Sequence, residues 1–103
     1  FSRRIFAMSY KILVENINVP GPTSRVDKTK YLAMKKVLMS LLPVDESGIT
    51  QIEMLSLIQP YLPQDIFPEG AKFAWWMKTV QLDLEAKGVI KRNNSKPLTW
   101  YRL

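Results

Sequence analysis

The chain contains no cysteine and no histidine, and only 4 of its 103 residues are glycine. Without cysteine there are no disulfides, thiol nucleophiles or iron–sulfur clusters, and without either residue there is no zinc finger. The lack of histidine removes the commonest general acid and base. The few glycines form neither a P-loop nor a dinucleotide-binding fingerprint. We therefore predict a protein that is not an enzyme and that holds no cofactor and no metal.

Long hydrophobic runs are also missing, since no stretch approaches the ~20 apolar residues needed to cross a bilayer. The segment from Ile5 to Met8 is too short for the apolar part of a signal peptide. We therefore predict a cytoplasmic protein without a membrane partner. The first methionine is Met8, so we interpret residues 1–7 as non-native or upstream sequence, and residues 1–9 as a tag or a disordered N-terminus.

The size and composition of the chain predict one globular domain. It has a mass of 11.9 kDa, and 47% of its residues are hydrophobic. The formal net charge is +6, or +4 if Arg3 and Arg4 are excluded with residues 1–7. A positive balance favours a polyanionic partner, although solubility alone is an alternative explanation of the charge.

The first half of the chain predicts an extended segment followed by a helix. Residues 10–19 are rich in β-formers and predict an extended or edge strand that ends at Pro20-Gly21-Pro22, and residues 10–26 as a whole are interpreted as an extended arm. Asp27 is a favourable N-cap, and Pro43 stops the helix that follows. The apolar positions that recur at helical spacing are Tyr31, Met34, Val37, Leu38, Leu41 and Leu42.

The second half predicts two more helices and a hairpin. Ile49 is expected to form a short pairing strand, and Thr50-Gln51-Ile52-Glu53 is a capping box that starts a helix. A third helix is predicted from about Glu69 or Ala71 to Lys87, ended by Gly88. Residues 89–92 and 98–103, joined by five turn-forming residues, predict a β-hairpin.

This order of elements is that of a winged helix, in which a helix-turn-helix is followed by a two-stranded wing. We therefore predict an α+β fold: a winged-helix domain at residues 27–103, with a three-helix core and a C-terminal hairpin, preceded by the arm at residues 10–26.

Two segments carry a resemblance to a known group of proteins: residues 75–90, WWMKTVQLDLEAKGVI, and residues 96–100, KPLTW. The chain from about Val14 to Arg102 resembles an uncharacterised family of small bacterial winged-helix-like proteins. More distantly, it is similar to the winged-helix domain that precedes the nuclease in Mrr-type restriction enzymes. That likeness implies nucleic-acid binding by analogy only, and the chain has no nuclease domain.

The predicted third helix has two apolar faces. The first, which we expect to be core, consists of Phe73, Trp76, Met77, Val80 and Leu84. The opposite face contains Trp75 and Leu82, whereas a helix that reads DNA is expected to be polar there. Three explanations stay open: this face packs on the hairpin, the N-terminal arm covers it, or Trp75 and Leu82 form an interface with a second chain.

Basic and amide side chains near the third helix and the hairpin are the candidates for contact with DNA. They are Lys72, Lys78, Thr79, Lys91, Arg92, Asn93, Asn94 and Lys96. The same residues also fit ordinary turn chemistry and a solvated surface. Two functions are therefore expected: a DNA-binding or DNA-associated module, or a protein-interaction or dimerisation module without nucleic acid.

Overall fold

The computed structural model describes residues 11–103, so the interpretations of residues 1–9 lie outside it. Within residues 11–103 the fold is α+β, with three α-helices and two antiparallel sheets of two strands each. The helices are α2, α3 and α4, and two short 3₁₀ turns, η1 and η2, lie between α3 and α4.

The predicted arm is a β-hairpin rather than a single extended segment. Strand β1 spans Lys11–Asn16 and pairs with β2, Val19–Asp27, in antiparallel register. The expectation that Pro20-Gly21-Pro22 ends the strand is wrong, because β2 continues through these residues. Each strand has a single partner and therefore one free edge, where proline's missing N–H is tolerated. Register shifts on both sides of Glu15 accommodate this irregular stretch.

Helix α2 spans Lys28–Leu41 and confirms the predicted N-cap, since the Asp27 carboxylate accepts a hydrogen bond from the Lys30 backbone N–H. Its buried side chains are Tyr31, Met34, Val37 and Leu38, as the spacing predicts. Helix α3 spans Gln51–Ile58 and begins with the predicted capping box. The Thr50 hydroxyl accepts from the Glu53 N–H, and the Glu53 carboxylate accepts from the Thr50 N–H. The turn η1, Gln59–Tyr61, extends α3.

Helix α4 spans Phe73–Ala86 and begins a little later than the sequence predicts. The delay has a backbone cause: Glu69 in η2, Pro68–Gly70, and then Lys72 adopt left-handed conformations with φ of 53° and 56°. These angles interrupt a right-handed helix. At the other end, Gly88 has φ +73° and supplies the predicted left-handed stop.

The C-terminal hairpin is confirmed. Strand β3, Ile90–Asn93, pairs antiparallel with β4, Thr99–Arg102. The expected short strand at Ile49 forms a single bridge to Trp100. Gly48 lies so close to this bridge that a Cβ there would come within 2.7 Å of the Trp100 carbonyl oxygen.

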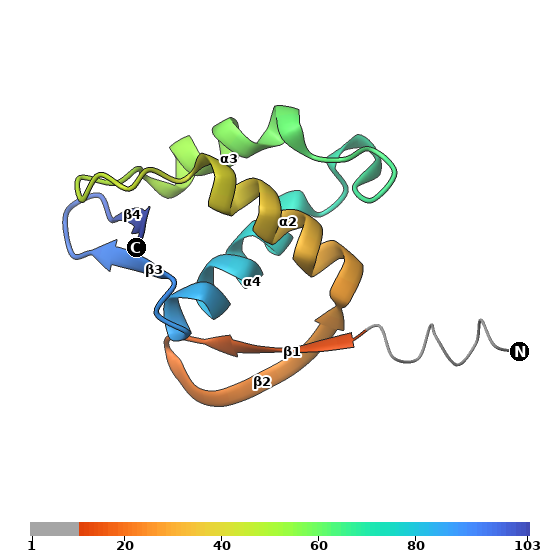
Figure 1. Cartoon of the computed structure of the whole chain (residues 1–103), viewed down its shortest axis with the longest axis horizontal. Helices are drawn as coiled ribbons and strands as arrows, with labels where there is room; N and C mark the ends of the chain where they lie inside the picture. Colours follow the sequence, from red (N-terminus) through yellow and green to blue (C-terminus); the bar gives the residue numbers. More distant parts are fainter. Residues whose placement is uncertain (1–10) are drawn as a thin grey trace, which may run out of the picture.

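Helix α4 occupies the centre of the molecule (Figure 1). The β1–β2 hairpin packs along one side of α4, α2 packs on another, and β3 returns beside its C-terminal end. The predicted core stripe is confirmed, since Trp76, Met77, Val80 and Leu84 are buried and Phe73 packs against the core. In the C-terminal half of α4, Val80 to Ala86, every residue is buried or half-buried.

Candidate functional site

Charge is distributed unevenly along the chain. Residues 70–103 contain seven Lys and Arg but only two acidic residues, so this segment has a net charge of +5, against +6 for the whole chain. Both acids, Asp83 and Glu85, lie on α4. The surroundings of these two carboxylates decide which charges this part of the molecule presents to solvent.

The Asp83 side chain is fully buried and binds three separate elements. Its carboxylate accepts hydrogen bonds from the Tyr31 hydroxyl of α2 and, at 2.9 Å, from the Glu15 backbone N–H of β1. The Lys87 ammonium lies 2.8 Å from the same carboxylate. Burial and the neighbouring Asp83 carboxylate raise the pKa of Tyr31 well above its usual range. Asp83 is therefore a structural group that joins β1, α2 and α4.

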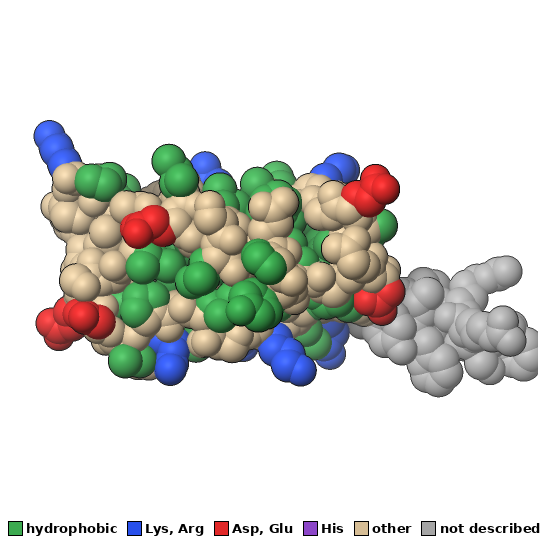
Figure 2. Space-filling view, turned by 90° about the horizontal axis from the view of Figure 1, so that it is seen from above, with side chains coloured by type: hydrophobic (Ala, Val, Ile, Leu, Met, Phe, Trp, Pro, Cys, Tyr) green, Lys and Arg blue, Asp and Glu red, His purple; other side chains and the backbone are tan. Residues whose placement is uncertain are grey.

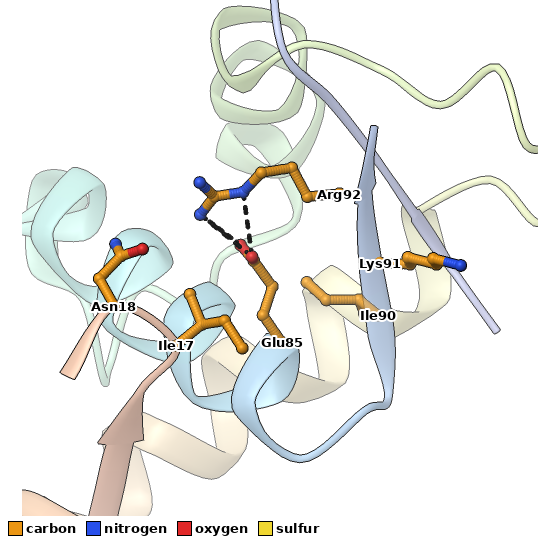
Figure 3. A pocket seen from close by; sticks show the side chains of 6 residues that line it. All are labelled: Ile17, Asn18, Glu85, Ile90, Lys91 and Arg92. Carbon is orange, nitrogen blue, oxygen red and sulfur yellow. Dashed lines mark hydrogen bonds and ion pairs between the residues drawn. The ribbon is translucent and has the colours of Figure 1, made fainter. Parts of the chain in front are cut away.

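Glu85 is also buried, and it faces the C-terminal hairpin. The Arg92 guanidinium donates to both carboxylate oxygens, with nitrogen–oxygen distances of 3.1 and 3.2 Å (Figure 3). The Trp100 indole N–H donates at 2.6 Å, and the Gln81 amide donates at 3.1 Å. This second network joins α4 to β3 and β4, so Asp83 and Glu85 point to different sides of the helix.

Because both acids are internal, the exposed charges of residues 70–103 are all positive. The exposed lysines are Lys72, Lys78, Lys87, Lys91 and Lys96. Among the described residues, only Lys87 of these five has an ion-pair partner. Four lysines thus face solvent without a neutralising carboxylate.

The residues predicted to contact DNA fall into two groups at opposite ends of α4. Lys72 and Lys78 are exposed at its amino-terminal half, and Thr79 beside them is half-buried. Lys91, Asn94 and Lys96 are exposed on the hairpin. The 14 residues of α4 span about 21 Å from one end of the helix to the other.

Two residues of the predicted set make internal contacts instead of facing solvent freely. Arg92 is bound to Glu85. The Asn93 amide donates to the Glu46 carbonyl and to the Thr99 hydroxyl. On the same strand, the Lys91 side chain points away from Glu85 (Figure 3). Alternation along β3 therefore separates an outward lysine from an inward arginine.

The two predicted interface residues differ in exposure. Trp75 is 53% exposed, whereas Leu82 is half-buried. The β1–β2 hairpin packs against α4. The hairpin does not bury Trp75.

A cleft of about 540 Å³ opens beside Trp75, at the amino-terminal end of α4. It is lined by Lys30 of α2 and by Lys72, Trp75 and Trp76. Lys30 was not among the predicted contact residues. The sequence signal that was missed is the spacing within α2, which places Lys30 four residues before the buried Met34 and so near the core-facing side of the helix.

A second, more apolar groove of about 660 Å³ lies between α2 and the segment that follows α3. Leu32 of α2 and Tyr61 of η1 are exposed there. Hydrophobic side chains gather at the centre of the face seen from above, and most charged side chains lie toward its rim (Figure 2).

Comparison with known proteins identifies a family. The model of a family of unknown function (DUF6958) matches residues 11–100. The chain belongs to this family. No curated protein and no solved structure is significantly similar to the DUF6958 chain. The prediction of an uncharacterised family is confirmed, while the likeness to winged-helix and Mrr-type domains stays a prediction.

Within residues 11–103 no group of three or more acidic side chains is placed to hold a metal ion. None of the helices in this part of the chain is long and apolar enough to span a bilayer. The features that remain include the unpaired lysines, the cleft at Trp75 and the groove along α2.

Proposed function

We propose that the DUF6958 chain is a nucleic-acid-binding module of the bacterial cytoplasm that acts by binding rather than by catalysis, with DNA as its partner. The single observation that carries this proposal is that residues 70–103 expose only positive charge. Both acids of that segment are buried and bound to internal partners. A phosphate backbone approaching α4 and the hairpin therefore meets four unpaired lysines and no exposed carboxylate of that segment.

The order of elements supports a winged-helix mode of binding. Helices α2, α3 and α4, the bridge at Ile49 and the β3–β4 hairpin follow one another as in that fold. In this assignment α4 is the recognition helix and β3–β4 is the wing. Recognition helices contact DNA chiefly through their amino-terminal residues, and in α4 this is the half that has exposed side chains.

The proposed contacts are to phosphates rather than to base edges. The exposed residues in the first half of α4 are Ala74, Trp75 and Lys78, and only the lysine has a charged donor. Lysine acts on phosphate as a point charge with three donors. We therefore propose binding with little sequence preference, in which each of Lys72, Lys78, Lys91 and Lys96 contacts a phosphate of its own.

The test is fluorescence anisotropy with a labelled mixed-sequence duplex at low salt. The double variants Lys72→Gln/Lys78→Gln and Lys91→Gln/Lys96→Gln should each weaken binding. The matched control, Lys28→Gln/Lys36→Gln, removes the same charge from exposed positions of α2 and should weaken it much less. Absence of binding by the unmodified protein, or an equal loss in the control, would overturn the proposal.

A second candidate function is a protein-interaction or dimerisation module, favoured by the exposed apolar groups at Trp75, Leu32 and Tyr61. Sedimentation at micromolar concentration tests self-association. A dimer that becomes a monomer on Trp75→Glu, but not on Tyr61→Glu, would place the contact at the exposed Trp75 and the half-buried Leu82. A monomer at every concentration would exclude dimerisation.

A further inference from the structure

The cleft at the amino-terminal end of α4 combines an exposed aromatic ring with two cations. We propose that it binds one unpaired nucleobase together with its adjacent phosphates, so that its ligand is single-stranded nucleic acid. This inference rests on the proposed function and names the form of nucleic acid that this end of the molecule prefers.

The indole of Trp75 is a large apolar surface that is held in place while facing solvent. It is 53% exposed, although the same helix buries Trp76. The two rings meet edge to face, with centroids 5.0 Å apart and an interplanar angle of 87°. Trp76 in turn contacts the buried Phe67, at 6.5 Å and 70°. This aromatic series fixes the outer ring, so little conformational entropy remains to be lost when a base stacks on it.

The two lysines come from different elements and converge on the same cleft. Lys30 projects from the first turn of α2, and Lys72 immediately precedes α4. Among residues 11–103, no carboxylate lines the cleft and neither lysine has an ion-pair partner. Lys72 adopts a left-handed backbone conformation, φ 56°, which is uncommon for a residue with a Cβ and is often found at functional positions.

The size and chemistry of the cleft fit one nucleotide better than a duplex. Its volume of about 540 Å³ lies within the usual range for small-ligand sites. In a duplex the faces of the bases are covered by their stacked neighbours, so an indole can reach a base face only where the base is unpaired. Stacking on an aromatic ring flanked by cations is the usual way in which proteins bind single strands without reading their sequence.

Tryptophan fluorescence provides a direct readout, because Trp75 is exposed while Trp76 and Trp100 are only 7% and 5% exposed. The probe is an oligothymidine of about 12 nucleotides, within the site sizes of single-strand binders. It is compared with a duplex of the same length and with inorganic phosphate. We expect the single strand to quench the exposed tryptophan and to bind more tightly than the duplex, and phosphate alone to cause no quenching.

The variants separate stacking from charge. The Trp75 variants lack the reporting tryptophan, so their binding is measured by the fluorescence anisotropy of a labelled oligothymidine. Trp75→Ala should weaken binding of the single strand by about tenfold or more, since stacking on one aromatic ring is worth that much, and Trp75→Phe should restore part of the affinity. Lys30→Gln and Lys72→Gln should each weaken it and reduce its salt dependence. The matched controls are Tyr61→Ala, an exposed aromatic on η1, and Lys36→Gln on another face of α2; both should bind normally.

The outcomes distinguish this inference from the proposed function. Loss of single-strand binding in Trp75→Ala but not in Tyr61→Ala supports the cleft, even if the duplex does not bind. Duplex binding that equals or exceeds single-strand binding and is unchanged by Trp75→Ala overturns the cleft and leaves the proposed function in place. If neither form binds at low salt, both proposals fail.

Discussion

The carboxylate of Asp83 offers the sharpest test of how the fold is held together. Substitution by asparagine keeps the size of the side chain and one oxygen for the Glu15 N–H, but it removes the negative charge. The Tyr31 hydroxyl then has only a neutral partner, and the Lys87 ammonium loses its ion pair. The effect therefore falls on the contacts that join α2 and the end of α4.

The expected magnitude follows from these contacts. A hydrogen bond to a charged group contributes about 1.5–3 kcal/mol and one between neutral groups about 1 kcal/mol, so weakening the tyrosine contact costs about 1 kcal/mol. The ion pair adds at most about 1 kcal/mol, because the Lys87 side chain is 40% exposed and is screened by solvent. Asp83→Asn should thus lower the free energy of unfolding by about 2 kcal/mol. Asp83→Ala, which leaves a hydroxyl and a backbone N–H without their acceptor, should cost about 2–6 kcal/mol.

The assays are urea unfolding and thermal unfolding, each followed by circular dichroism and by tryptophan fluorescence. A loss of 2 kcal/mol should lower the melting temperature by about 8–16 °C in a domain of this size. Asp65→Asn, at an exposed position before α4, is the matched control and should change stability by less than about 0.5 kcal/mol. If Asp83→Asn is as mild as this control, the buried network does not stabilise the fold and the reasoning is refuted.

Three further predictions concern single residues. Burial and a neighbouring carboxylate raise the pKa of Tyr31 above its usual 10.0. The protonated hydroxyl therefore stabilises the fold fully below that pH, and this stabilisation is lost as the pH rises above it. Tyr31→Phe should flatten the alkaline decline of the free energy of unfolding measured in urea, and an unchanged decline would contradict this. Thr50→Ala should lower the free energy of unfolding by about 1 kcal/mol. The backbone N–H from which Glu53 accepts a hydrogen bond lowers the pKa of that carboxyl from its usual 4.5. Glu53 therefore stabilises the fold above that pH and ceases to do so as the pH falls below it, which unfolding in acid will show. Gly48→Ala should lower the melting temperature more than Gly21→Ala, because both have positive φ but only the first places a Cβ against a backbone carbonyl.

Much of the fold could be predicted from local signals. Asp27, Thr50 and Gly88 mark helix ends through their own side chains or their backbone freedom, so the boundaries they set do not depend on the rest of the molecule. The core stripe of α4 follows from helical periodicity in the same way.

Other features could not be predicted because they depend on contacts distant in sequence. The β1–β2 hairpin passes through prolines that ordinarily end a strand, and it is held to α4 by Asp83, 68 residues after its partner Glu15. Arg92 has the positive charge expected of a DNA contact, yet it binds Glu85 within the fold. A single sequence shows the charge of such a residue but not the direction of its side chain. Each network has one local sign in the sequence, a pair of partners four residues apart: Asp83 with Lys87 in the first, and Gln81 with Glu85 in the second.

The dependence of DNA affinity on salt tests the central claim most directly, since that claim is that unpaired lysines of residues 70–103 neutralise phosphates. Each neutralised phosphate contributes about −0.9 to the slope of log affinity against log salt concentration, so contact by all four lysines predicts a slope of about −3.6 with a mixed-sequence duplex. A slope near zero, or no binding at the lowest salt concentration, would contradict the account.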